Sequence, residues 1–191
     1  MQLVVLNVAY PFSPVGPEVV GSGAQVAQLD AALVRGGHES IVMACEGSTT
    51  DGILLATRKP TGAPDEMRRH SVHEQYRFTL GQFLEKWPID LIHFHGEDFY
   101  EYLPGPGIPV LITLHSPAAS YPDAIFRLDR PQTFLHCVSN QQRSSCPPCQ
   151  YLLPEIESGQ TEQYLALYEH LVRDAREAEA ALRAKDAPAA H

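Results

Sequence analysis

Two histidines, two carboxylates and several hydroxyls follow the apolar segments of this 191-residue sequence. The residues that could carry chemistry are Tyr10, His95, Glu97, Asp98, His115, Ser116 and Ser139. Imidazoles and carboxylates can accept a proton, and hydroxyl groups can bond a polar ligand. The set is therefore typical of a site for a hydroxyl-rich molecule, in which one member could serve as a base. Strand ends are also polar without any function, and for each single residue that alternative stays open.

The loop Gly21-Ser22-Gly23 begins a helical pattern, and glycines at a helix start let backbone amides approach a phosphate. A dinucleotide fold needs G-x-G-x-x-G or A directly after the first strand, and an acid after the second. Glu46 could be that acid, but Val26 stands at the third glycine position and the first apolar run already ends at Val8. The NAD interpretation fails on both counts. The long loop favours instead a flap that brings amides to a ligand entering from outside.

Two further patterns suggest metal or redox chemistry. His93 and His95 form an H-x-H pair whose side chains share one face of a strand. His93 lies inside an apolar run, which favours a core histidine, and no third ligand is placed nearby, so we expect no metal site. Cys146 and Cys149 form a C-x-x-C pair, but a strand-like segment follows it and no second pair is present. We interpret it as part of a connector.

Six short apolar runs alternate with helical patterns along the chain. The runs cover residues 3–8, 40–45, 52–57, 90–95, 109–115 and 133–139, and helical spacing covers residues 23–38 and 65–87. Continuous apolar runs suit strands that are buried on both faces. The alternation predicts an α/β protein with a Rossmann-like, doubly wound parallel sheet, and it places the polar residues at the carboxyl edge of that sheet.

Each helical segment has an apolar side. In residues 23–38 that side comprises Val26, Leu29, Ala32 and Leu33, and in residues 65–87 it comprises Met67, Val72, Tyr76, Leu80, Phe83 and Leu84. Residues 161–185 form a third, long helical pattern with a stripe of Tyr164, Leu165, Leu167, Tyr168, Leu171, Val172 and Ala175. We expect the first half of this helix to pack on the domain and its end to fray.

Composition excludes several classes of protein. An apolar fraction of 44% and a charged fraction of 19% are typical of a globular chain. The net charge of −9 argues against a nucleic-acid partner, because phosphate backbones are bound by lysine and arginine. No apolar run is long enough to span a membrane, and no basic leader precedes the first one. We therefore expect a cytoplasmic protein whose cysteines stay reduced.

Four blocks, in order, resemble the N-terminal half of GT-B glycosyltransferases, specifically the large retaining family 4, also described as group 1. The blocks are NVAYPFSPVGPEVVGSGAQVAQLDAALVRGGHES, DLIHFHGEDF, PVLITLHSP and LHCVSNQQR. The resemblance implies half of a GT-B fold, with a single Rossmann-like domain over residues 1–159. Residues 160–191 would form a C-terminal helix that packs on this domain.

The resemblance also implies roles for the candidate residues. Gly21, Ser22 and Gly23 would face the diphosphate of the donor, and His115 would lie at the reaction centre. The acceptor, a sugar or another hydroxyl compound, would be bound by Tyr10, His95, Glu97, Asp98, Ser116 and Ser139. Family members usually have adjacent glycines with an acid two residues later, whereas here Ser22 separates the glycines and Gln25 replaces the acid.

Family members carry a second Rossmann-like domain that binds a UDP- or GDP-sugar and contains two glutamates eight residues apart. Here LLPEIESG resembles the hinge into that domain, and the C-terminal helix follows at once. We expect the donor domain to be absent between Gly159 and Thr161. Glu169 and Glu177 have the family spacing, but they lie on the terminal helix and we interpret them as a coincidence.

Three hypotheses remain open at this point. The chain is the acceptor-binding half of a retaining glycosyltransferase, inactive or weakly active alone and without a cofactor of its own. Alternatively, it is a subunit or binding module that needs a partner chain with the donor half. A third possibility is a stand-alone flavodoxin-like protein that binds a nucleotide or another small molecule. Cleft surface normally shared with a donor domain also predicts self-association.

Overall fold

Six parallel strands form one sheet in the computed structural model, which describes residues 1–62, 65–156 and 160–186. The strands are β1 (Val4–Val8), β2 (Glu39–Cys45), β3 (Ile53–Thr57), β4 (Leu91–Phe94), β5 (Val110–Leu114) and β6 (Thr133–Cys137). Each of the six predicted apolar runs matches one strand, and only β2 begins one residue before its predicted run. They are parallel and lie in the order β3-β2-β1-β4-β5-β6.

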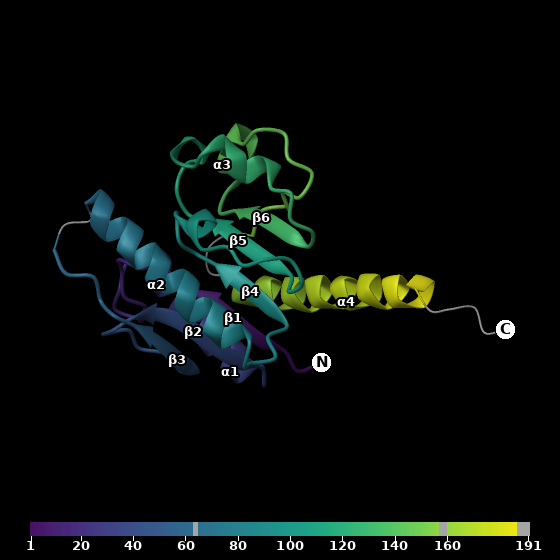
Figure 1. Ribbon diagram of the computed structural model, residues 1–191, viewed down its shortest axis with the longest axis horizontal. Helices are drawn as coiled ribbons and strands as arrows, with labels where there is room; N and C mark the ends of the chain where they lie inside the picture. Colours follow the sequence, from purple (N-terminus) through teal and green to yellow (C-terminus); the bar gives the residue numbers. More distant parts are fainter. Residues whose placement is uncertain (63–64, 157–159, 187–191) are drawn as a thin grey trace.

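Helices cover both faces of the sheet (Figure 1). Within the described residues, the α-helices are α1 (Ser22–Arg35), α2 (Glu66–Leu84), α3 (Asn140–Ser145) and α4 (Thr161–Asp186). Short 3-10 helices follow β4 and β5: η1 (Phe99–Glu101), η2 (Ala118–Ser120) and η3 (Asp123–Arg127). Helix α2 packs on one face, and α1 and α4 pack on the other. The predicted α/β, Rossmann-like parallel sheet with one long C-terminal helix is confirmed.

The strand order separates two of the nucleotide-binding topologies. The order 3-2-1-4-5-6 is that of dinucleotide-binding folds, whereas flavodoxin-like sheets have the order 2-1-3-4-5. The flavodoxin-like alternative is therefore wrong in topology. In both types of sheet, a ligand binds beyond the carboxyl ends of the strands, where the order reverses. Here the reversal lies between β1 and β4, which are hydrogen-bonded neighbours.

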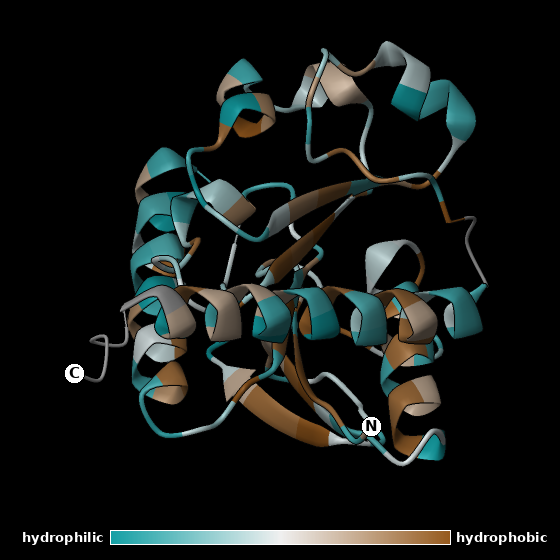
Figure 2. Ribbon diagram, turned by 90° about the vertical axis from the view of Figure 1, so that its right-hand side faces the viewer, coloured by the Kyte–Doolittle hydropathy of each residue, from teal (hydrophilic) through white to brown (hydrophobic). Residues whose placement is uncertain are grey.

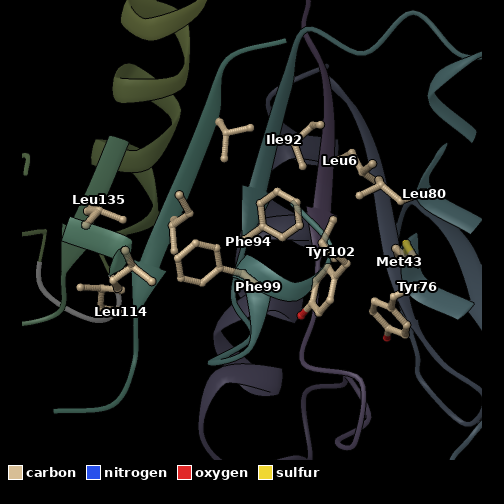
Figure 3. Close-up of a cluster of buried hydrophobic side chains, with 14 of the residues drawn as sticks. Leu6, Met43, Tyr76, Leu80, Ile92, Phe94, Phe99, Tyr102, Leu114 and Leu135 are labelled. Atoms are coloured by element: carbon tan, nitrogen blue, oxygen red, sulfur yellow. The ribbon is translucent and has the colours of Figure 1, made fainter. Parts of the chain in front are cut away.

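The face under α2 forms the larger hydrophobic core (Figure 3). Leu6, Ile92 and Phe94 alternate along β1 and β4 at 0% exposure, and Tyr76 and Leu80 of α2 lie over the same core. The aromatic rings of Phe99 and Tyr102, from the segment after β4, close its carboxyl end in Figure 3. Successive strand residues point to opposite faces, so this core uses every second residue of each strand.

The opposite face is covered by α1 and by the first half of α4, which crosses the strands in Figure 2. Tyr164, Tyr168, Leu171 and Val172 of α4 are buried there, as predicted. Between residues 173 and 184, every side chain except Ala175 is exposed, and this part of α4 projects beyond the sheet in Figure 1.

Some local predictions were wrong or fall outside the described part of the chain. Met67, expected on the buried side of α2, is 84% exposed. Helix α3 was not predicted, and the short strand expected after Cys149 is a single bridge between Leu152 and Leu135. The hinge at residues 157–159, with the expected junction at Gly159, and the end at residues 187–191 lie outside the described residues. No helix in the described segments is long and apolar enough to cross a membrane.

Candidate functional site

The glycine loop ends a long connection from β1 and begins α1. Gly21 is the residue before the helix, and its backbone has φ 79° and ψ −145°, a conformation that is almost confined to glycine. Gly23 is required for a different reason, because a Cβ atom there would lie 2.4 Å from the carbonyl oxygen of Pro14. Gly21 therefore turns the chain into the helix, and Gly23 allows the proline-rich loop to pack against it.

A cavity of about 310 Å³ brings two of the predicted groups together. Its lining residues are Gly21, Ser22, Ala24, Gln25, Gln28, His115 and Val138. Gly21 and Ser22 come from the start of α1, and His115 follows the end of β5, so the cavity joins segments that are far apart in the sequence. Gly23 is buried and does not line it. We call this space the glycine-loop cavity.

A second cavity of about 350 Å³ adjoins the first and shares His115 and Val138 with it. The remaining lining residues are Ser116, Pro117, Ser139, Gln141, Gln142 and Ser145. The side-chain amide of Gln142 donates to the carbonyl oxygens of Leu114 and Ser116, which fixes the segment that carries His115. We call this space the α3 cavity. His115 is the one ionisable side chain that lines both cavities among the described residues.

Polar side chains replace apolar ones along the carboxyl half of the face under α4. We call the six residues Asn7, His93, His95, Thr113, His115 and His136 the polar layer. They come from β1, β4, β5 and β6 and from the positions that directly follow β4 and β5. Five of the six are at most 1% exposed, and His115, at the cavities, is partly exposed. Buried polar groups on this scale require hydrogen-bond partners.

Two histidines of the layer are fully engaged within the fold. His93 contacts the hydroxyl of Tyr168 through Nδ1 at 2.6 Å and the hydroxyl of Thr113 through Nε2 at 2.7 Å. The backbone N–H of Ile156 donates to Nε2 of His136 at 2.5 Å, and Nδ1 of His136 lies 3.3 Å from the hydroxyl of Tyr164. The prediction of His93 as a core histidine is confirmed.

The other two histidines form a chain with Asn7. Nε2 of His115 lies 3.2 Å from Nδ1 of His95, and Nε2 of His95 lies 3.2 Å from Oδ1 of Asn7. The Nδ2 atom of Asn7 is buried without a hydrogen-bond partner among the described residues. An unmet buried donor costs about 1–3 kcal/mol. The same amide keeps its oxygen in contact with His95.

Burial holds these histidines in the neutral form. It lowers the pKa of His93 and of His95 well below the ordinary value of 6.5, and the neighbouring histidines lower both further. Burial also lowers the pKa of His115 to about 4 and that of His136 to about 4. At neutral pH, His115 therefore presents an uncharged imidazole to the cavities. This ring has one N–H donor and one acceptor nitrogen, and it does not carry the second proton that a general acid would transfer.

Two residues predicted for acceptor binding lie on the other face. Asp98 is 6% exposed, and its carboxylate contacts Nε2 of His73 at 2.7 Å and accepts from the hydroxyl of Tyr102 at 2.8 Å. Tyr10 is partly buried nearby, and burial, followed by the charge of Asp98, raises the pKa of its hydroxyl. His95, predicted with them, is 1% exposed and lines neither cavity. None of these three residues lines the cavities beside His115, although His95 bonds His115 from behind.

The remaining predicted residues gather at the rim of the α3 cavity. The hydroxyl of Ser116 donates to the carboxylate of Glu97, which is exposed. The hydroxyl of Ser139 accepts from the backbone N–H of Gln142 at 3.2 Å and so caps α3. Ser139 therefore has a structural role, and Glu97 and Ser116 together form a polar group that faces solvent.

A cavity larger than these two does not coincide with the predicted residues. It has about 450 Å³ and lies along the outer side of α1, where Arg35, Thr49 and Asp30 are among the lining residues. Asp30 is 1% exposed, and its carboxylate accepts from the hydroxyl of Ser40 and from the backbone of the segment before β3. Because these bonds occupy both carboxylate oxygens, Asp30 is a structural residue, and the smaller cavities remain the better candidates.

The cysteines show no metal or redox arrangement in the described segments. Cys146 directly follows α3, and its sulfur lies 3.5 Å from that of Cys137 without a disulfide bond. Burial raises the pKa of the Cys137 thiol to about 12, so this thiol is unreactive at neutral pH. Within the described residues, no three His, Cys, Asp or Glu side chains are grouped so that they could hold a metal ion.

Several residues of the site were missed from the sequence. Gln25, which lines the glycine-loop cavity, also bonds the hydroxyl of Tyr164, and Gln142 fixes the rim. Asn7 and His136 complete the polar layer. A signal for the layer was present, since His93 and His95 alternate with apolar residues at a spacing of two, as do Thr113 and His115.

Comparison with known protein families gives a match over the centre of the chain. Residues 19–144, more than half of the chain, match the family model described as Glycosyltransferase Family 4. The matched segment includes the glycine loop, His115 and Ser139, and it leaves out Asn7, Tyr10 and helix α4. No curated protein is similar enough to the chain to count as a relative.

Proposed function

This chain belongs to glycosyltransferase family 4, and we propose that it is the acceptor-side half of an enzyme that transfers a sugar from a nucleotide donor to a hydroxyl acceptor. The observation that carries the proposal is the glycine-loop cavity, which joins the start of α1 to His115. A phosphate site and a polar side chain that share one cavity are what the transfer of a sugar from a phosphate requires.

The donor diphosphate would lie at the start of α1. The first backbone N–H groups of a helix have no partner within the helix and carry partial positive charge, so they favour an anion. The first turn of α1 contains no acidic side chain that would repel one. Gly21 and Ser22 line the cavity at this point, whereas Gly23 contributes through its packing.

His115 would lie between donor and acceptor. Since burial lowers the pKa of its imidazole to about 4, the side chain is neutral at pH 7 and acts through hydrogen bonds to sugar hydroxyls. Retention of configuration, as the family resemblance implies, would then rest on the leaving phosphate of the donor as the group that assists the acceptor. The protein mainly positions the reactants and stabilises developing charge.

The acceptor would enter through the α3 cavity. This space adjoins the glycine-loop cavity at His115 and Val138. An acceptor hydroxyl there would lie near the proposed donor. Ser116, Ser139 and Gln141 supply polar groups along it, and Glu97 lies at its rim through its bond to Ser116. Tyr10 and Asp98 would contribute only from the other face of the sheet, as supports for the loop after β4.

The donor half is proposed to come from outside the described sheet, in a longer protein or in a partner chain. The described residues form one sheet, with α4 beginning five residues after Ile156 in the sequence. We propose that a UDP- or GDP-sugar is held mostly by that second half, and that this chain alone is inactive or nearly so. A sugar or another hydroxyl compound is the proposed acceptor.

Titration of the isolated chain with UDP and with GDP tests the phosphate contact. Followed by amide NMR, one of the two nucleotides is expected to shift the resonances of Ser22 and of the following residues, with a Kd on the order of 1 mM. The substitution Ser22→Asp places a carboxylate in the first turn of α1, where it stabilises the helix but repels a phosphate. Binding should fall by at least about tenfold, without loss of stability.

A control for charge is Met67→Glu, in the first turn of α2 on the other face of the sheet. It adds the same charge and is expected to leave nucleotide binding unchanged. Equal loss of binding in both variants, or no shift at Ser22 in the wild type, would contradict the phosphate site. Sustained nucleotide release from UDP-glucose or GDP-mannose by the wild type, absent in His115→Ala, would contradict the proposal that the chain needs a second half.

A further inference from the structure

His115 is the one histidine of the polar layer that has a ring nitrogen open to a cavity. His93 and His136 each bond protein groups through both nitrogens, and His95 does so as well. His115 bonds His95 through Nε2, whereas no described residue bonds its Nδ1. Because His115 also lines both cavities, its Nδ1 is the nitrogen that a ligand could reach.

The protonation of that nitrogen follows from the chain of bonds behind it. Oδ1 of Asn7 can only accept, so Nε2 of His95 must carry the hydrogen of their 3.2 Å contact. A neutral imidazole carries one ring hydrogen, which leaves Nδ1 of His95 as an acceptor. Nε2 of His115 must then carry the hydrogen of the next 3.2 Å contact, and Nδ1 of His115 is left with a lone pair.

We propose that Asn7 and His95 are positioning residues that hold His115 in the Nε2–H tautomer, so that its Nδ1 accepts a hydrogen bond from a ligand hydroxyl in the cavities. The ligand class, a sugar hydroxyl, rests on the proposed function, whereas the tautomer does not. The proposal gives a use to a buried amide that keeps an unpaired donor. It also assigns His95 a role behind the site in place of contact with the acceptor.

We call the hydrogen-bonded chain of Asn7, His95 and His115 the relay. The layout of the strands supports a rigid arrangement of this relay. The three residues come from β1 and from the positions just after β4 and β5, strands that are neighbours in the middle of the sheet. Asn7 and His95 are at most 1% exposed, so water does not compete for their bonds. The rings of His93 and His95 lie 3.9 Å apart between centroids, which restricts rotation of His95. The direction of the hydrogen bonds is therefore set by the amide of Asn7.

Histidine-selective ¹⁵N NMR of the whole chain, without ligand at pH 7, tests the proposal. The two nitrogens of an imidazole have separate resonances when one tautomer is fixed and averaged resonances when two tautomers exchange. His115 is identified by the signal that His115→Gln removes. We expect Nδ1 of His115 at the position of an unprotonated nitrogen. An Nδ1–H tautomer or an averaged signal in the wild type overturns the proposal without any variant.

Three substitutions test whether Asn7 sets the tautomer. Asn7→Leu removes the acceptor and is expected to move the Nδ1 signal of His115 toward the averaged position. Asn7→Asp keeps an acceptor and should keep the wild-type tautomer, so it serves as the rescue if Asn7→Leu fails to fold. Thr113→Val is the matched control, because it removes a buried hydrogen bond of the same layer, to His93, and does not touch the relay.

An equal shift in Thr113→Val and Asn7→Leu, or loss of the tautomer in a folded Asn7→Asp variant, overturns the assignment to Asn7. The outcome is separate from that of the proposed function, because no ligand is present. Addition of UDP-glucose then tests the ligand class. A further change of the Nδ1 signal supports a hydroxyl donor in the cavities, whereas a shift confined to Ser22 limits the contact to the phosphate and overturns the assigned role of Nδ1.

Discussion

The face of the sheet that α2 covers is apolar along most of the strands, with buried Thr57 and Thr133 only on the two edge strands, whereas the face that α4 covers changes from apolar to polar halfway. Both faces use alternate residues of the same strands, as Phe94 and His95 illustrate. On the first face, hydrophobic burial is the main stabilising contribution, and polar contacts such as that of Asp98 with His73 lie beyond the strand ends. On the second, each buried polar group needs a partner in one orientation, so the carboxyl half of that face gains directional contacts beside the cavities at the expense of hydrophobic burial.

The stability contributed by the two faces should respond differently to acid. The pKa values of the four histidines in the polar layer are lowered in the fold, so below pH 6.5 the unfolded chain binds protons that the folded chain does not. Stability should therefore be full above pH 6.5 and fall toward pH 4, with each histidine contributing up to about 1.4 kcal/mol per pH unit. Urea unfolding at pH 7.5 and 5.5 should differ by roughly 5 kcal/mol.

The source of this acid sensitivity can be checked with two variants. His136→Gln should reduce the pH dependence by about a quarter, since one of four neutral histidines is removed. His70→Gln, on the exposed side of α2, should leave it unchanged. If both variants behave alike, the acid sensitivity does not come from the polar layer.

Truncation on the apolar face should be nearly as costly and should not depend on pH. Phe94 is 0% exposed within the core under α2, so Phe94→Ala should destabilise the protein by about 3–5 kcal/mol. The control Phe78→Ala removes the same ring from the surface of α2, where it is 70% exposed, and should change stability by less than about 0.5 kcal/mol. Thermal unfolding of both variants measures these losses of stability. Equal losses would mean that burial under α2 is not the cause of the destabilisation.

Removal of one hydroxyl from the polar face should have a smaller effect. Tyr168→Phe deletes the partner of Nδ1 of His93 and leaves that buried nitrogen unpaired, which should cost about 1–3 kcal/mol. Tyr100→Phe is the control, because Tyr100 is 39% exposed. Equal stability of Tyr168→Phe and wild type in urea would mean that the layer tolerates unpaired groups, and the distinction between the faces would weaken.

The smallest effect on stability is expected at the open end of the polar layer. His115→Ala removes a partly exposed side chain with one hydrogen bond, to His95, and water can enter the vacated space from the cavities. The melting temperature should stay close to that of the wild type, with a loss of less than about 1 kcal/mol. If the proposed function holds, the same change in the complete enzyme should abolish sugar transfer. A large loss of stability would show that His115 is structural.

Much of the fold could be predicted because its signals are local. Six apolar runs and the periodicity of three helices are properties of short segments, and each run matches a strand to within two residues. Helix α3 escaped because it has six residues, none of them buried, so it has no apolar period. Met67 is 84% exposed although the sequence periodicity assigns it to the apolar side of α2. Periodicity identifies which side of a helix a residue lies on, whereas burial also depends on how far the sheet extends beneath the helix.

The site was predicted less completely. The sequence identifies residues at the carboxyl edge of the sheet, but it does not show which of them line one cavity. Sequence position placed His95, Asp98 and His115 at the carboxyl edge, but the two faces there are separated by the sheet itself, and each side chain reaches only one of them. Counting alternate positions from His115 would have grouped it with Thr113 and away from Leu114. The partners supplied by α4, Tyr164 and Tyr168, could not be inferred, since they depend on how a distant helix docks.

Helix α4 is the last element of the described chain, and its tyrosines complete the bonds of His93 and His136. During synthesis, the segments that form the sheet, α1 and α2 leave the ribosome before α4 does, so the face under α2 can close while the part of the opposite face under α4 is still uncovered. The nascent chain then exposes the imidazole rings of His93 and His136 to water. A chaperone would bind most usefully to this ribosome-bound intermediate, because the face under α4 is uncovered in it. The intermediate would end when α4 leaves the ribosome and packs on that face.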